Sequence, residues 1–155
     1  MDNTAGPTNI LAFVDAILGT DQLSGATPGT LTVYTFATES ASLLNGLIDR
    51  PTTSRFRALA AGYYRYHYSG SAYPSANNRG WQHLVRLNGT TTVVGSQSQA
   101  ISGQSQATRS SSTTSTGIVL LAANDYLELA GDPVDGTTFT TILYTSFMMQ
   151  LVRLT

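Results

Sequence analysis

The residues that could carry acid-base or metal chemistry in this chain are few. Two histidines, His67 and His83, stand in β-type sequence, and the 155 residues include no cysteine. Catalysis would need a base held beside a nucleophile and oriented by a third group, and the sequence has no phosphate loop, nucleotide fingerprint or pair of histidines at metal-ligand spacing. We therefore interpret both histidines as structural or interface residues, and we expect no enzyme activity and no cofactor.

Two carboxylates near the C-terminal third remain open to two interpretations. Asp132 and Asp135 bracket Pro133 and Val134, and Gly136 follows. This pattern is typical of a turn, and loop carboxylates are also ligands for calcium. The sequence does not decide between a plain turn and a calcium site.

The charge of the chain excludes one class of partner. Eight basic residues, all arginine, oppose nine acidic ones, and only 11% of the residues are charged. Nucleic-acid binding depends on a basic surface, so no nucleic-acid partner is expected. A neutral surface rich in Ser and Thr fits a protein that other subunits partly cover.

The N-terminal segment predicts a short amphipathic helix. Ile10, Phe13, Val14 and Ile17 recur at helical spacing, with Thr8 or Asn9 as the cap and Gly19 as the stop. Such a helix could pack on its own domain or dock on a larger partner, and we assign these four residues to docking. We expect residues 1–30 to be a docking segment and connector, and residues 31–155 to form the folded domain.

Two further properties of the sequence bear on its location. Asp2 and Asp15 are unlike the cationic start and unbroken apolar core of a secretory signal, so we expect folding in a cytoplasm. The apolar runs are far shorter than the ~20 residues that cross a bilayer, so no membrane insertion is expected.

From Leu31 onward the sequence predicts short strands separated by turns. In residues 63–68 tyrosines alternate with Arg65 and His67, which indicates a strand with one buried face. Asn88-Gly89 between two β-prone runs predicts a type I′ hairpin. The Ser- and Gln-rich stretch 95–116 is interpreted as exposed strand and loop, and residues 117–121, 126–129, 137–144 and 146–154 as further strands. Regular short strands indicate an all-β sandwich or barrel.

Three segments, in order, resemble the globular heads of complement and the tumour-necrosis-factor-like cytokines. They are SRFRALAAGYYRYHYSG from Ser54, TSTGIVLLAANDYLELAG from Thr114 and TSFMMQLVRL from Thr145. The last departs from the pattern, because Met149 stands where that family usually has Gly. The resemblance implies an antiparallel two-sheet jelly roll that forms a homotrimer.

The resemblance also implies where the side chains of two strands point. Tyr64, Tyr66 and Tyr68 would fill the sandwich, whereas Tyr63, Arg65, His67 and Phe147 would face neighbouring subunits. A threefold axis would bring three copies of Arg65 and His67 together. Their charges would repel unless an anion, a carboxylate such as Glu128, or loss of the histidine proton relieved them.

The resemblance does not determine the function, because one fold serves many roles. With no export signal or collagen-like stalk in the sequence, we expect a trimeric bacteriophage structural protein on the virion surface, assembled in the host cytoplasm. It would decorate the capsid, bound to the major capsid protein, or form a short head fibre. The alternative is a head module of a viral fibre or bacterial surface protein that binds a cell-surface receptor or glycan.

Overall fold

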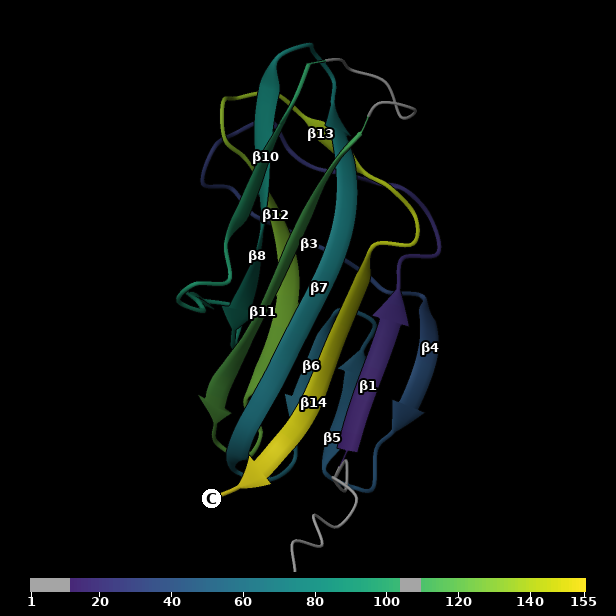
Figure 1. Ribbon diagram of the computed structural model, residues 1–155, viewed down its shortest axis with the longest axis vertical. Helices are drawn as coiled ribbons and strands as arrows, with labels where there is room; N and C mark the ends of the chain where they lie inside the picture. Colours follow the sequence, from purple (N-terminus) through teal and green to yellow (C-terminus); the bar gives the residue numbers. More distant parts are fainter. Residues whose placement is uncertain (1–11, 104–109) are drawn as a thin grey trace, which may run out of the picture.

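Two antiparallel β-sheets packed face to face make up the computed structural model, which describes residues 12–103 and 110–155 (Figure 1). Sheet A contains β1 (Ala12–Ile17), β2 (Gln22–Leu23), β4 (Thr38–Leu43), β7 (Gly62–Pro74), β11 (Ser111–Leu121), β13 (Phe139–Thr141) and β14 (Ser146–Leu154). Sheet B contains β3 (Thr32–Val33), β5 (Ile48–Thr52), β6 (Arg55–Ala58), β8 (Arg79–Leu87), β9 (Thr91–Thr92), β10 (Ser98–Ser102) and β12 (Tyr126–Pro133).

The long strand β7 organises sheet A. It pairs with β11 along one side, and with β14 and then β13 along the other. Beyond β14 the sheet continues through β1 to β4. Sheet B has the order β10-β8-β12-β6-β5, with β3 added to β12 and β9 to β8. The expected all-β, two-sheet antiparallel jelly roll is thus confirmed.

Aromatic side chains fill the space between the sheets. Tyr64, Tyr66 and Tyr68 of β7 point inward and are buried, as the alternation of that segment predicts. Phe56 of β6 and Phe147 of β14 meet edge to face with ring centroids 4.7 Å apart. This geometry is favourable for aromatic pairs and fixes how the two sheets pack.

The prediction of an N-terminal helix is wrong over residues 12–17, which form the strand β1. Ala12, Val14 and Ala16 alternate as buried residues, and β1 lies between β14 and β4. Phe13 and Val14 lie on opposite faces of β1, so these residues do not form one helical face here, and pairing with two neighbouring strands makes the segment a strand. Residues 12–17 are therefore part of sheet A.

Other local expectations are confirmed. Asn88 and Gly89 both have positive φ, 52° and 68°, as a type I′ turn requires, and they connect β8 to β9. The Ser-rich stretch contains β10 and the start of β11, although its residues 104–109 lie outside the described part. Over the described residues, no helix is long and apolar enough to cross a membrane.

Candidate functional site

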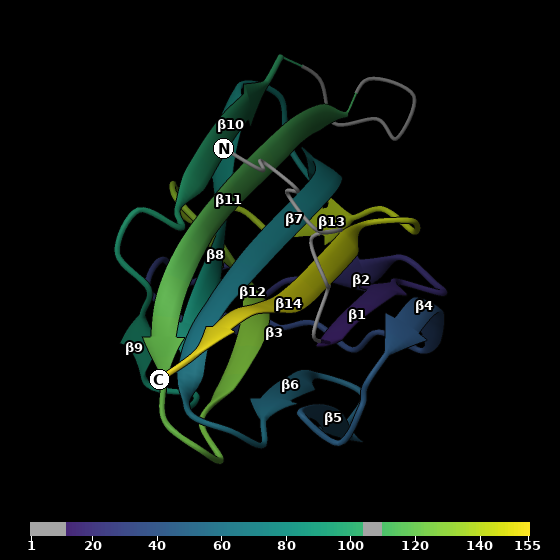
Figure 2. The same cartoon turned by 60° about the horizontal axis from the view of Figure 1, so that its bottom comes forward.

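The outer face of sheet A, turned away from the core, holds three of the residues expected at a subunit interface, namely Tyr63, Arg65 and His67. Figures 1 and 2 show β11, β7 and β14 running side by side across this face. Across the strands, Leu120 of β11 is in register with Tyr63 of β7, and Ile118 is in register with Arg65. On the other side of β7, Gln150 of β14 is the partner of Arg65.

An apolar patch occupies the end of this face where β7 begins. It consists of Tyr63, Ile118, Leu120 and Val152, whose side chains come from three strands. Ile118 and Leu120 are 58% and 56% exposed, and Val152 is 43% exposed. Tyr63, Ile118 and Val152 line a shallow hollow together with Arg153, whose guanidinium carbon lies 4.9 Å from the centre of the Tyr63 ring.

The apolar surface continues around the free edge of β11. There Ile118, Val119 and Leu120 line a second hollow with residues from the end of β8 and from the segment that follows it. We call this surface the β11 edge, and it also contains Leu87, Val93 and Val94. Val94 is 97% exposed. The patch and the β11 edge meet at Ile118 and Leu120.

The structure places the predicted interface residues of β7 on the outer face of sheet A. Tyr63 and His67 are half-buried there, and Arg65 is exposed. Arg65 forms no ion pair with any described residue, and its neighbours in register are Ile118 and Gln150.

Phe147 is placed differently from the expectation, because it is fully buried in the core. It is in register with the buried Tyr68, so the outer face of β14 carries Met148 and Gln150 instead. Glu128 is also elsewhere: it lies in sheet B, where its Oε1 accepts a hydrogen bond of 3.1 Å from Arg55 Nε. It is therefore paired within its own subunit.

The three described residues among the four assigned to docking do not lie on one face of β1. Val14 is fully buried inside the sandwich, so it cannot reach a partner in this fold. Phe13 and Ile17 lie half-buried on the outer face of sheet A, beside Leu43 and Thr38 of β4. Ile10 lies outside the described residues.

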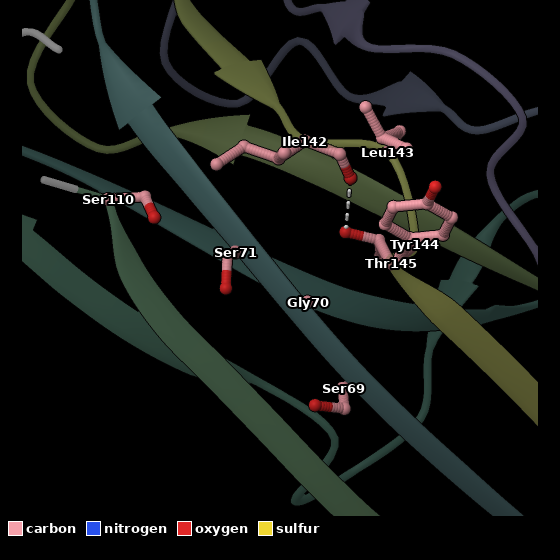
Figure 3. A pocket seen from close by; sticks show the side chains of 8 residues that line it. All are labelled: Ser69, Gly70, Ser71, Ser110, Ile142, Leu143, Tyr144 and Thr145. Atoms are coloured by element: carbon pink, nitrogen blue, oxygen red, sulfur yellow. Dashed lines mark hydrogen bonds between the residues drawn. The ribbon is translucent and has the colours of Figure 1, made fainter. Parts of the chain in front are cut away.

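A polar hollow of about 310 Å³ lies at the other end of the same face, where β7 approaches its C-terminal end (Figure 3). We call it the hydroxyl hollow, and nothing in the sequence patterns predicted it. Three serine side chains and the turn between β13 and β14 surround it. Its lining residues are Ser69, Gly70, Ser71, Ser110, Ile142, Leu143, Tyr144 and Thr145.

The second histidine is buried beneath that face and cannot act on a substrate. His83 is fully buried, with Nδ1 2.5 Å from the Thr113 hydroxyl and Nε2 3.2 Å from the Thr141 hydroxyl. Thr141 in turn donates a hydrogen bond of 2.7 Å to the hydroxyl of Tyr34. Burial lowers the pKa of His83 to about 3, so the ring is neutral in the folded protein.

The two carboxylates that could bind calcium are occupied by hydrogen bonds within the chain. Asp132 accepts from the Gly29 amide at 2.7 Å and from the Gln82 side chain at 2.8 Å. Asp135 accepts from the Gly80 amide at 2.9 Å. Among the described residues, no three metal-ligating side chains gather at one place. The geometry of this segment is that of a turn tied to its neighbours.

Known proteins resemble this chain in structure and not in sequence. No protein-family model and no curated protein matches the sequence. The globular domain of zebrafish complement 1qA protein superposes with a TM-score of 0.58 at 12% identity, over 93% of this chain and 99% of that one. The fold is that of the complement heads.

Two cytokine structures extend this likeness. Eiger TNF from S. frugiperda gives a TM-score of 0.60 at 12% identity, and covers 93% of this chain and 92% of its own. Murine APRIL at pH 8.0 gives 0.62 at 11% identity, over 90% of this chain and 98% of its own. The TNF- and complement-type jelly roll therefore accounts for nearly all of this chain, and identity this low establishes the fold alone.

Proposed function

We propose that this protein is a non-enzymatic homotrimeric module whose subunits meet through the outer face of sheet A. The observation that carries the proposal is the apolar patch, which three neighbouring strands hold open to solvent. Soluble monomers rarely expose contiguous apolar side chains, and a partner subunit is a common cover for them. Complete burial of His83 supports the non-enzymatic part of the proposal.

The apolar surface has two different parts, which favours a ring over a two-fold dimer. A head-to-tail contact joins two unlike surfaces and closes into a ring when the rotation allows it. In the proposed trimer the β11 edge of one subunit packs on the apolar patch of the next. This arrangement also covers the backbone groups along the free edge of β11, which would otherwise invite pairing with other strands.

Arg65 and His67 lie beside the apolar patch, so a threefold axis through this region brings their copies together. Like charges taken out of water repel strongly unless something neutralises them. We expect the trimer to tighten in the presence of a multivalent anion such as phosphate.

The trimer is tested by the mass of the protein in solution. Sedimentation equilibrium of the wild type should give three times the chain mass, and Ile118→Asp should give a folded monomer because it places a charge in the interface. Ile101→Asp is the matched control, since Ile101 is an exposed strand residue of sheet B with 74% exposure. A monomeric wild type, or a control as disruptive as Ile118→Asp, would contradict the proposal.

For the biological role we propose a bacteriophage capsid decoration or short head-fibre protein, held on the virion surface. A nearly neutral surface with 11% charged residues, rich in Ser and Thr, supports a role in assembly over binding to nucleic acid. Three copies of one attachment surface would add avidity at a threefold point of a lattice. The partner would be the major capsid protein.

This role is tested on purified particles from the source. Quantitative mass spectrometry should find the protein in the virion fraction at a fixed ratio to the major capsid protein, and purified trimer should sediment with particles that lack it. If the protein is absent from particles and does not sediment with them, the virion role fails while the trimer stands.

The second candidate role is a receptor- or glycan-binding head. One observation favours it, namely the hydroxyl hollow on the outer face of sheet A, which is formed by uncharged polar groups and an exposed aromatic ring. A purely structural surface does not need such a hollow.

A further inference from the structure

We infer that the hydroxyl hollow is a binding site for a neutral sugar unit, with Tyr144 as the aromatic platform. This inference deepens the glycan-binding role and does not depend on the trimer. It rests on three features of the described residues: the conformation of Tyr144, the chemistry of the lining side chains, and the way in which the surrounding turn is anchored.

The backbone of Tyr144 is in a conformation that a bulky residue rarely adopts. Its φ is +70°, whereas the other non-glycine residues with positive φ in the described part are Asn45, Asn78, Asn88 and Asn124. Asparagine tolerates this region well and tyrosine does not. The turn from Ile142 to Thr145, closed by a hydrogen bond of 3.3 Å from the Thr145 amide to the Ile142 carbonyl, holds this conformation. It leaves the Tyr144 side chain 74% exposed beside the hollow, and residues in such conformations gather at ligand-binding sites.

The turn that carries Tyr144 is anchored on both sides. The Thr145 hydroxyl donates to the carbonyl of Ile142 at 2.9 Å, the bond drawn in Figure 3. The Leu143 amide donates to Asp21 Oδ1 at 2.8 Å, and the Tyr144 amide donates to the Leu18 carbonyl at 3.2 Å. A binding group held by its surroundings loses little freedom on contact with a ligand.

Close packing brings this turn against β7. A side chain at Gly70 would meet Thr145, because the ideal Cβ position lies 2.8 Å from the Thr145 Cγ2 atom. Glycine at this position, on the core-facing side of β7, therefore lets Thr145 pack directly against the strand. Its volume of about 310 Å³ is at the small end of the range for ligand pockets, which suits one sugar ring.

The lining groups select for an uncharged, hydroxyl-rich ligand. Ser69, Ser71 and Ser110 carry hydroxyls, which both donate and accept hydrogen bonds, as sugar hydroxyls do. The hydroxyl of Thr145 is buried and already donates to the Ile142 carbonyl. Among the described residues, none with a charged side chain lines the hollow. A phosphate or an acidic sugar would lack a counter-charge, and a lipid chain would leave these polar groups unpaired.

The hydroxyl of Ser69 is the one most available to a ligand. Ser69 is exposed, and its side chain makes no hydrogen bond with another described residue. Ser71 lies deeper and shares a hydrogen bond of 2.8 Å with Ser112 of β11. The aromatic ring of Tyr144 supplies the remaining element, a flat apolar face with a polar tip, on which the C–H side of a sugar ring can rest.

The test uses the full chain with isotope labelling and a panel of methyl glycosides of glucose, galactose, mannose and N-acetylglucosamine, with their short oligosaccharides. At least one of these neutral sugars should shift the amide signals of Ser69, Ser71 and Tyr144 in a saturable way. N-acetylneuraminic acid, inorganic phosphate and an uncharged Gly-Ser peptide should leave them unchanged.

Two variants separate the site from the fold. Tyr144→Gly removes the ring and relaxes the backbone, so the protein should fold at least as well and bind the sugar roughly tenfold more weakly or worse. Ser69→Val introduces a residue that favours β-strands and removes one hydroxyl, so the protein should fold and sugar binding should weaken by several-fold. Tyr63→Ala, in the apolar patch, is the control and should leave sugar binding unchanged.

The outcomes distinguish this inference from the trimer. If no neutral sugar of the panel shifts these signals, if phosphate or peptide binds instead, or if Tyr144→Gly binds as well as the wild type, the inference is overturned whatever the mass in solution. If a monomeric protein binds the sugar, the trimer fails and the sugar site stands.

Discussion

The buried ring of His83 makes stability depend on pH. In the unfolded chain this histidine has its ordinary pKa of 6.5, while burial lowers the pKa to about 3 in the folded protein. Between these values the unfolded state binds the proton and the folded state does not, so stability is complete above pH 6.5 and falls as the pH drops. The slope should approach about 1.4 kcal/mol per pH unit.

Urea unfolding at a series of pH values from near 7 to near 4 measures this slope. The control is His83→Gln, which keeps hydrogen-bonding groups near Thr113 and Thr141 but does not titrate in this range. Its unfolding free energy should change less with pH than that of the wild type. Equal slopes for the two proteins would mean that other groups cause the acid sensitivity.

Neighbouring residues of β7 should differ sharply in their effect on stability. Tyr66 is only 2% exposed, whereas Arg65 points outward from the same strand. We expect Tyr66→Ala to cost about 3 to 5 kcal/mol through lost burial and the cavity that remains. Arg65→Ala should stay within about 0.5 kcal/mol in a monomer.

This comparison is made by urea unfolding in the Ile118→Asp background, where subunit association does not contribute. Similar losses for Tyr66→Ala and Arg65→Ala in that background would mean that the two faces of β7 are assigned wrongly.

Single-residue placement was predictable where polar and apolar side chains alternate clearly. In β7, Arg65 and His67 mark the outer face, so Tyr64, Tyr66 and Tyr68 could be assigned to the core. In β14 the run Phe147-Met148-Met149 offers no such contrast, and a shift of one residue exchanges the two faces. The pairing of Phe147 with Tyr68 decides, and the sequence does not contain that register.

At the scale of elements, β1 is expected to be essential for the fold. It lies between β14 and β4 and buries Ala12, Val14 and Ala16 in the core. Deleting residues 1–18 would expose the inner edges of both neighbours and empty one side of the core. The truncated chain should lose its cooperative melting transition, measured by circular dichroism, or aggregate.

A control variant keeps β1 and changes only one residue on its outer face. Asp15→Thr alters the outer face of β1 without touching the core, so it should melt close to the wild type. If the deletion variant melted as the full chain does, the N-terminal segment would be an appendage after all.

Strands marked by turn residues were predictable as elements, and strands defined by distant partners were not. The Asn88-Gly89 turn identifies β8 and β9 locally, because both residues adopt positive φ. The sequence of β4, TESASL, contains little apolar character and all its residues are exposed. Pairing with β1 makes it a strand, and that contact joins separate parts of the chain. The hydroxyl hollow was not predictable for the same reason, because β7, Ser110 and the turn at Tyr144, which are far apart in the sequence, form it together.

At the scale of the whole molecule, the proposed trimer links stability to concentration. A subunit that folds and associates is stabilised by mass action, so the melting temperature should rise with protein concentration. Calorimetry over a hundredfold range of concentration (about two decades) should show this rise for the wild type, and none for Ile118→Asp. A wild-type melting temperature independent of concentration would argue that the apolar patch has no partner subunit.

The position of β1 also constrains the order of events during synthesis. Its hydrogen-bonding partner β14 follows every other described strand in the sequence, so sheet A cannot close until β14 has been made. Until then β1 and β7 each present an unpaired edge, and contacts this distant in sequence form slowly. We therefore expect a half-sheet with unpaired edges to be exposed during synthesis, and the yield of native protein to depend on chaperones that shield it.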